Sequence, residues 1–194
     1  GDELELLLHP DDMQTGIRLR LLPLTRSILA GLVDHGQARR NAEQIERRLL
    51  CPDGVRLTDA PARYAGGVST LFARAEQAAN VGREIGLMYT HAHIRYVEAM
   101  AALGDAEAAY RGLLVVNPIG IEKVVPNALP RQANAYFSSS DAAFDDRYRF
   151  ARDFAAVRDG AIPVRGGWRV YSSGGGIYLA RLIQDVYGLT VCES

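Results

Sequence analysis

Apolar residues recur at helical intervals over the first part of the chain. They do so between about Ile17 and Val33, and again over residues 36–50 (GQARRNAEQIERRLL). A repeat near 3.6 residues is the signature of an amphipathic helix. Pro23 interrupts the first stretch, and proline is tolerated in the first turn of a helix, so we expect a helix to begin near it. The pattern therefore predicts two amphipathic helices before residue 51.

The middle of the chain alternates turn signals with helical patterns. Residues 51–67 (CPDGVRLTDAPARYAGG) are predicted to form a loop, because proline and glycine punctuate them. From Ser69 to Leu103 we expect two helices, or one that is interrupted near Gly82 and Gly86. A shorter helix over 105–116 follows. The middle is thus expected to be helical with one long loop before it.

The last third is predicted to contain long loops and two helices. Residues 117–138 read as a loop, and Ser138–Asp141 (SSSD) is an N-cap cluster predicted to open a helix that ends near Arg158. A glycine-rich loop over 159–176 then precedes a helix from Ile177 to about Tyr187. Because strands do not alternate with helices, a parallel-sheet fold is not expected. The fold class is all-α, with long loops between helices.

The segment Arg83–Gly104 is expected to be a buried helix with one polar stripe. Its stripe contains Glu84, Met88, His91, Arg95 and Glu98, and most of the remaining circumference is apolar. Two interpretations stay open. The stripe faces a ligand cavity, or it forms an internal ladder in which Arg95 pairs with Glu98 and His91 bonds a carbonyl.

The segment GGWRVYSSGGGIY (166–178) gathers glycines and serines ahead of a predicted helix. Serine hydroxyls and free backbone N–H groups at a helix start favour a bound anion. The segment lacks the Gly-Lys-Ser/Thr of a nucleotide-binding P-loop. The alternative is a flexible capped turn without a ligand.

Two other sets of polar residues are better explained by structural roles than by metal binding or catalysis. On a helix His91 and His93 point about 200° apart, so they cannot share one metal ion, and we predict no metal site. The second group comprises Arg131, Asp141, Asp145 and Asp146. Paired carboxylates suit acid–base chemistry, but these lie where a helix start is predicted, so capping is favoured.

Composition narrows the classes of partner. Hydrophobic residues are 48% of the chain, the net charge is −1, and no like-charge run occurs, so no nucleic-acid partner is expected. No apolar run reaches the roughly 20 residues of a membrane span, and the acidic N-terminus does not resemble a signal peptide. Cys51 and Cys192 lie far apart, which favours a reducing compartment. The chain begins at Gly1, and we expect it to be part of a longer polypeptide.

Several blocks together resemble the C-terminal part of family-94 glycoside phosphorylases. They are TGIRLRLLPLTRSILAGL, RAEQAANVGREIGLMYTHAHIRYVEAMAALG, NPIG, RQANAYFSSSDAAFDDRY and GGWRVYSSGGGIY. The resemblance runs from about Leu8 to Leu189. Within the family, the blocks are similar to the phosphorylase-like C-terminal domain of cyclic β-1,2-glucan synthases and to 1,2-β-oligoglucan phosphorylases.

The resemblance implies a fold and a reaction. The family folds as an (α/α)6 barrel flanked by β domains, so residues 1–194 are expected to be the C-terminal portion of such a barrel. Its members cleave a β-glucoside with inorganic phosphate and invert the anomeric centre, which gives α-glucose 1-phosphate. Inorganic phosphate is the co-substrate, and no further cofactor is implied.

The resemblance also assigns residues. It implies phosphate binding by His91, Ser172, Ser173 and Gly174, and substrate binding by Glu84 and Arg95. The family's general acid, an upstream aspartate, and its upstream phosphate-binding arginine match nothing here. We therefore expect no catalytic residue in the chain, and an isolated chain that is inactive. It would expose apolar surface that the remainder of the parent normally covers, so self-association is expected.

Three functions remain as alternatives. The first is the C-terminal domain of a cyclic β-1,2-glucan synthase, which implies a cytoplasmic location at the inner membrane. The second is part of a stand-alone 1,2-β-oligoglucan phosphorylase in the cytoplasm. The third is a non-catalytic helical interaction domain that only retains the barrel shape. The first two bind a β-1,2-linked glucan.

Overall fold

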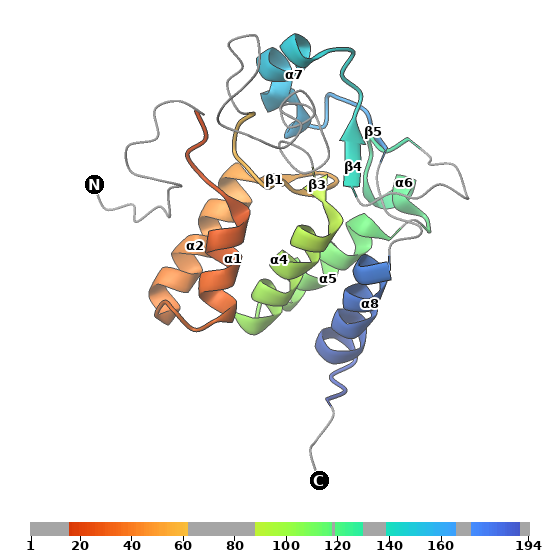
Figure 1. Ribbon diagram of the computed structural model, residues 1–194. Helices are drawn as coiled ribbons and strands as arrows, with labels where there is room; N and C mark the ends of the chain where they lie inside the picture. The colour runs from red at the N-terminus through yellow and green to blue at the C-terminus, as the bar shows by residue number, and fades with distance from the viewer. Residues whose placement is uncertain (1–15, 62–87, 118, 130–138, 166–171, 191–194) are drawn as a thin grey trace.

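The computed structural model describes residues 16–61, 88–117, 119–129, 139–165 and 172–190 (Figure 1). Most of their regular structure is helical, which confirms the expected predominance of helices. Five helices carry the fold: α1 (Leu21–Leu29), α2 (His35–Arg48), α4 (Thr90–Ala102), α5 (Ala106–Val116) and α8 (Ser172–Arg181). The shorter ones are α6 (Ile121–Val124), α7 (Arg147–Asp153), the 3-10 helix Phe154–Val157 and the π-helical turn Leu182–Val186. The barrel stays a prediction.

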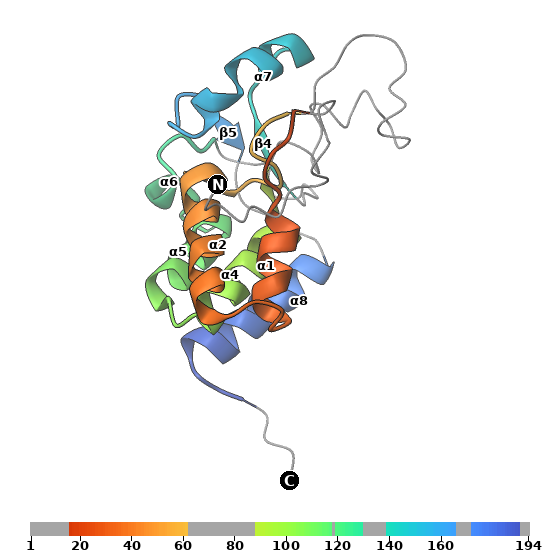
Figure 2. The ribbon, with the colours of Figure 1, turned by 90° about the vertical axis from the view of Figure 1, so that its left-hand side faces the viewer.

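The five main helices pack with alternating directions. Helix α4 lies against both α1 and α8, while α2 packs on α1 and α5 packs on α4 (Figures 1 and 2). In Figure 1, α1, α4 and α8 run downward and α2 and α5 run upward. The N-terminal ends of α1, α4 and α8 therefore face the same side of the helical layer.

The predicted helix starts are set by short polar side chains and by proline. The Asp34 carboxylate accepts a hydrogen bond from the Gln37 N–H at 2.7 Å and begins α2. The Asp105 carboxylate accepts one from the Ala108 N–H at 3.0 Å and begins α5. Pro23 lies in the first turn of α1, as predicted. These caps satisfy N–H groups that have no partner within the helix.

The main core lies where α1, α2, α4 and α5 meet. Its buried side chains include Leu19, Leu21, Leu24, Ile45, Leu49, Val55, Tyr96, Val97, Met100 and Leu113. Most come from the apolar positions of the predicted amphipathic helices. Burying such side chains contributes about 1.5–3 kcal/mol each, so this cluster holds α4 between its neighbours.

Two small antiparallel sheets were not predicted. Strands β1 (Leu50–Cys51) and β2 (Gly54–Val55) form a hairpin that begins at the last residue of the predicted helix 36–50 and continues in the segment expected to be a loop. The second sheet has the order β3-β4-β5, made of β3 (Met88–Tyr89), β4 (Ser139–Ala142) and β5 (Val164–Arg165). Figure 1 shows β3 running directly into the start of α4.

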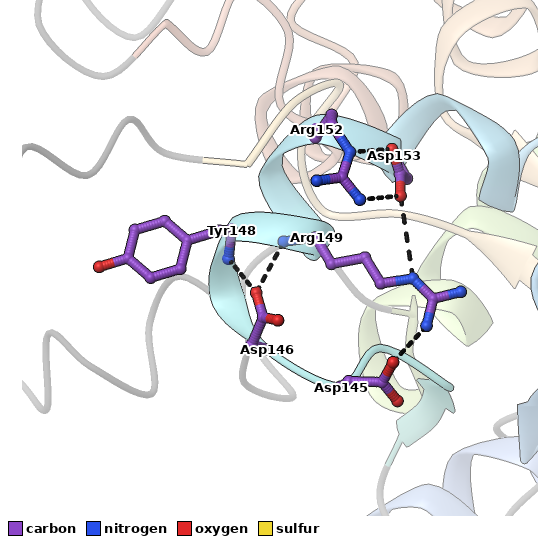
Figure 3. A network of polar contacts seen from close by, with 6 residues as sticks. All are labelled: Asp145, Asp146, Tyr148, Arg149, Arg152 and Asp153. Carbon is purple, nitrogen blue, oxygen red and sulfur yellow. Dashed lines mark hydrogen bonds and ion pairs between the residues drawn. The ribbon is translucent and has the colours of Figure 1, made fainter.

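The predicted N-cap cluster at Ser138–Asp141 is wrong for the residues described there. Residues 139–141 belong to β4, because they pair with β3 and β5. Helix α7 begins at Arg147 instead, and Asp146 caps it by accepting hydrogen bonds from the N–H groups of Tyr148 and Arg149, both at 2.8 Å (Figure 3). Capping is thus confirmed for Asp146 alone.

Asp145, a further carboxylate of this group, belongs to a set of ion pairs around α7. Arg149 pairs with Asp145 and lies 3.8 Å from Asp153, which in turn binds Arg152 (Figure 3). These are exposed ion pairs along one helix, so they give no sign of an acid–base pair. Arg131 lies outside the described residues.

Two predicted element boundaries are wrong. The helix expected over Arg83–Gly104 begins at Thr90, because Met88 and Tyr89 form β3. The last helix was expected from Ile177, but α8 begins at Ser172 and includes the three consecutive glycines. The serine–glycine segment is therefore the first turns of a helix and not a loop before one.

Candidate functional site

The first turn of α4 holds two polar side chains with different surroundings. Thr90 is fully buried, and its hydroxyl oxygen has no hydrogen-bond partner. His91 is partly buried, and its ring stacks on that of Tyr89 with centroids 6.1 Å apart. Strand β3 ends at Tyr89, directly before α4, so its pairing in the sheet fixes where α4 begins.

Two arginines lie near enough to His91 to influence its pKa. Burial lowers the pKa of its imidazole, and the guanidinium groups of Arg95 and Arg26 lower that pKa further. Arg95 lies one turn along α4, and Arg26 comes from α1. A neutral imidazole near two guanidinium groups can share a hydrogen bond with an anion that both arginines attract.

The first turn of α8 contains the other predicted phosphate-binding residues, Ser172, Ser173 and Gly174. The first N–H groups of a helix have no partner within it, and the helix dipole favours negative charge at that end. Helix α8 packs beside α4, and both begin on the same side of the helical layer (Figure 1). His91 and these three residues therefore lie at helix starts on the same side of the helical layer.

Arg95 belongs to a ladder of charges that joins α4 to α8. Its Nη1 lies 2.5 Å from a Glu98 oxygen, the other Glu98 oxygen lies 3.4 Å from Nη1 of Arg181, and Arg181 lies 3.3 Å from Asp185. All four side chains are partly buried. The ion pair expected if the polar stripe forms an internal ladder is therefore present. The second predicted substrate-binding residue, Glu84, lies outside the described residues.

The histidine that bonds a carbonyl is His93, whereas the sequence interpretation gave that role to His91. The Val55 N–H donates to Nδ1 of His93 at 3.1 Å, so Nε2 carries the proton and donates to the Gly112 carbonyl at 2.7 Å. Complete burial lowers the pKa of His93 to about 4. His93 is thus a neutral part of the core. In the part of the chain that the structure describes, no three His, Cys, Asp or Glu residues are grouped as metal ligands.

Sequence reasoning missed Arg26 and Thr90. Arg26 occurs in the first helical block, where an exposed cation in an amphipathic helix looks ordinary, and only the packing of α1 on α4 brings it near His91. Thr90 directly precedes His91, but whether a buried hydroxyl has a partner is decided by tertiary contacts. No sequence signal reports either fact.

Comparison with known proteins shows a clear similarity to an enzyme. The chain is 60% identical over 187 residues to a 1,2-beta-oligoglucan phosphorylase of Listeria innocua serovar 6a (strain ATCC BAA-680 / CLIP 11262). The match covers 96% of this chain and 17% of that protein, so the chain spans about 17% of the length of the curated relative it matches. No protein-family model matches the chain. Among the described helices, none has the length and apolar character needed to cross a membrane.

Proposed function

We propose that the chain is part of a glycoside phosphorylase that acts on β-1,2-linked glucans and helps to hold inorganic phosphate. The observation that carries this is the position of His91 and of Ser172–Gly174, in the first turns of two neighbouring helices that begin on the same side. The 60% identity to a 1,2-beta-oligoglucan phosphorylase supports the substrate class.

The chemistry divides between this chain and the remainder of the parent. A phosphate oxygen forms a bond to the anomeric carbon on the face opposite the glycosidic oxygen, whose bond breaks with inversion. A carboxylic acid from the remainder of the parent protonates the departing oxygen. His91 and the N–H groups at the start of α8 hold the phosphate for this attack. The isolated chain is therefore inactive, and phosphate is the only co-substrate besides the glucan.

The two predicted substrate-binding residues take different parts in this proposal. Glu84 accepts a hydrogen bond from the sugar. The ion pair to Glu98 holds Arg95 at Nη1, but its Nε is buried without a hydrogen-bond partner. Arg95 therefore acts on the ligand through its charge near His91 and through this remaining donor.

Helix α8 and the turn after it carry an exposed apolar face. Leu179, Ile183, Val186 and Tyr187 are each at least 40% exposed. Clustered apolar exposure of this kind marks an interaction surface. We propose that the remainder of the parent covers it, and that the isolated chain self-associates through it. Sedimentation of the isolated chain against an Ile183→Glu variant tests this, and a monomeric wild type would contradict it.

The proposed function is tested by His91→Ala in the intact parent enzyme. We expect kcat/KM for phosphate to fall ~100-fold, because a contact made to the attacking group is lost, while thermal stability stays the same. His35→Ala is the matched control, since His35 is exposed at the start of α2. Unchanged dependence on phosphate in His91→Ala and in Ser173→Ala would instead favour the non-catalytic interaction domain.

The synthase-domain interpretation is the second candidate, and the segment GGWRVYSSGGGI favours it. It predicts a parent that sediments with the inner membrane and makes cyclic glucan. The phosphorylase interpretation predicts a soluble cytoplasmic parent that releases α-glucose 1-phosphate. Fractionation of source cells with an antibody against this chain separates the two.

A further inference from the structure

Thr90 differs from the other buried serine and threonine residues that the structure describes. Thr25 donates to the Leu21 carbonyl at 3.2 Å, Ser27 to the Leu24 carbonyl at 2.8 Å, and Thr58 to the Ala60 carbonyl at 2.9 Å. These three hydroxyls have their partners within the chain. The Thr90 hydroxyl is equally buried and has none.

An unpartnered buried hydroxyl is costly. Leaving such a group without a hydrogen bond keeps the full cost of removing it from water, whereas valine has nearly the same shape and no such cost. The hydroxyl at position 90 therefore weakens the ligand-free protein. The presence of a hydroxyl here is explained if it bonds to a ligand that is not part of the chain.

The position of Thr90 indicates what that partner is. It is the first residue of a helix of 13 residues, and side chains in a helix lean toward its N-terminal end, so the hydroxyl leans toward the start of α4. Next to it lies His91, with Arg26 and Arg95 near the imidazole. The free N–H groups of the first turn add to this positive surrounding. The acceptor that suits a hydroxyl donor in such a place is an anionic oxygen.

We propose that the Thr90 hydroxyl is a further ligand of the inorganic phosphate, donating a hydrogen bond to a phosphate oxygen beside His91. This inference rests on the proposed phosphorylase function. Because the hydroxyl is covered in the free structure, the contact forms only when side chains at the start of α4 separate to admit the anion. Thr90 thus exchanges a buried unpartnered state for a charge-assisted hydrogen bond on binding.

The test compares Thr90→Val and Thr90→Ser in the intact parent enzyme. Valine removes the hydroxyl and keeps the shape, while serine keeps the hydroxyl and removes the methyl group. We expect Thr90→Val to raise the KM for phosphate about tenfold, as expected for one lost hydrogen bond to a charged group, with the KM for the glucan unchanged. Its melting temperature without phosphate should equal or exceed that of the wild type, and the rise caused by phosphate should shrink. Thr90→Ser should retain most of the phosphate affinity.

The matched control is Thr25→Val, which removes a buried hydroxyl that already has a partner in α1. It should lower stability and leave the KM for phosphate unchanged. A wild-type KM for phosphate in Thr90→Val would overturn the inference, and so would a change confined to the KM for the glucan. If His91→Ala impairs phosphate use while Thr90→Val does not, only this inference fails. A parent with neither phosphate-dependent activity nor stabilisation by phosphate overturns the proposed function as well.

Discussion

Two histidines, two residues apart on α4, show how differently one side chain is used in this molecule. His93 is buried with both ring nitrogens bonded to backbone groups of β2 and α5. His91 is partly buried at the start of the helix, next to a hydroxyl without a partner and near two arginines. A residue whose partners all lie within the chain stabilises the fold, whereas one whose surroundings are incomplete is available to a ligand.

The region around His93 is built for close contact. Gly54 has φ +123°, and an added Cβ would lie 2.9 Å from Nδ1 of His93. Nearby, Arg56 and Asp53 form a fully buried ion pair at 2.8 Å. Nε of Arg56 is buried without a partner, but both Nη atoms of that guanidinium bind Asp53, whereas the Thr90 hydroxyl at the start of α4 has no partner at all. The comparison therefore separates a structural region from the proposed binding region along one helix.

The comparison is tested most strongly by replacing each histidine with alanine. His93→Ala leaves a cavity and two unpaired backbone groups, so we expect the free energy of unfolding to fall by about 3–5 kcal/mol. His91→Ala should change it by less than about 1 kcal/mol, because few contacts within the chain are lost. Urea unfolding of both variants measures the difference. Equal losses would remove the distinction between the two regions.

Acid should weaken the His93 region. Its pKa is about 4 in the folded chain against 6.5 in the unfolded chain, so between these values the unfolded state binds more protons. The stabilisation is complete above pH 6.5 and is lost as the pH falls toward 4. The total loss is roughly 3 kcal/mol, at 1.36 kcal/mol per pKa unit.

The control for this pH dependence is His93→Gln, which can offer a similar donor and acceptor without titrating. Its free energy of unfolding should fall less over the same pH range than that of the wild type. His91 titrates in the same direction, since its pKa is also lowered, but it is common to both proteins. Parallel pH profiles for the two proteins would show that His93 can be protonated without cost in the folded state.

The helices of the main layer could be predicted from the sequence because their signals are local. Asp34, Asp105 and Pro23 sit at or near helix starts, and the apolar periodicity that follows each is strong. The predicted N-cap at Ser138–Asp141 failed because a tertiary interaction prevailed. Residues 139–142 pair with strands that lie far away in sequence, and no local pattern contains that information.

The candidate site was predictable only in part. Sequence motifs predicted His91 and the serine–glycine segment. The structure places them at the starts of α4 and α8, which lie on the same side of the helical layer. Arg26 required the packing of α1 on α4, and Thr90 required knowledge of every neighbour of one hydroxyl. The resemblance singled out His91, but the apolar periodicity gave no sign that His93 is a buried core residue bonded on both ring nitrogens.

The close contact at His93 is tested next by Gly54→Ala. The substitution strains a left-handed backbone and forces a methyl group against the imidazole, so we expect a loss of about 2–3 kcal/mol. Gly104→Ala is the matched control, since Gly104 has φ +77° and open space around it. It should lose only about 1 kcal/mol, from backbone strain alone. Thermal unfolding compares the two, and equal shifts would mean that the imidazole has room to move.

The smallest effect concerns the charge ladder that continues from the His91 side of α4. Glu98→Gln leaves Arg95 without its carboxylate partner and leaves Arg181 paired with Asp185 alone, so we expect a loss of about 1 kcal/mol that diminishes in high salt. Glu107→Gln breaks the exposed pair with Arg111 at 3.0 Å and should cost almost nothing. Chemical unfolding at low and high salt measures both variants. If Glu98→Gln behaved like Glu107→Gln, the ladder would not hold α4 against α8, and the alignment of the two helix starts would depend on apolar packing alone.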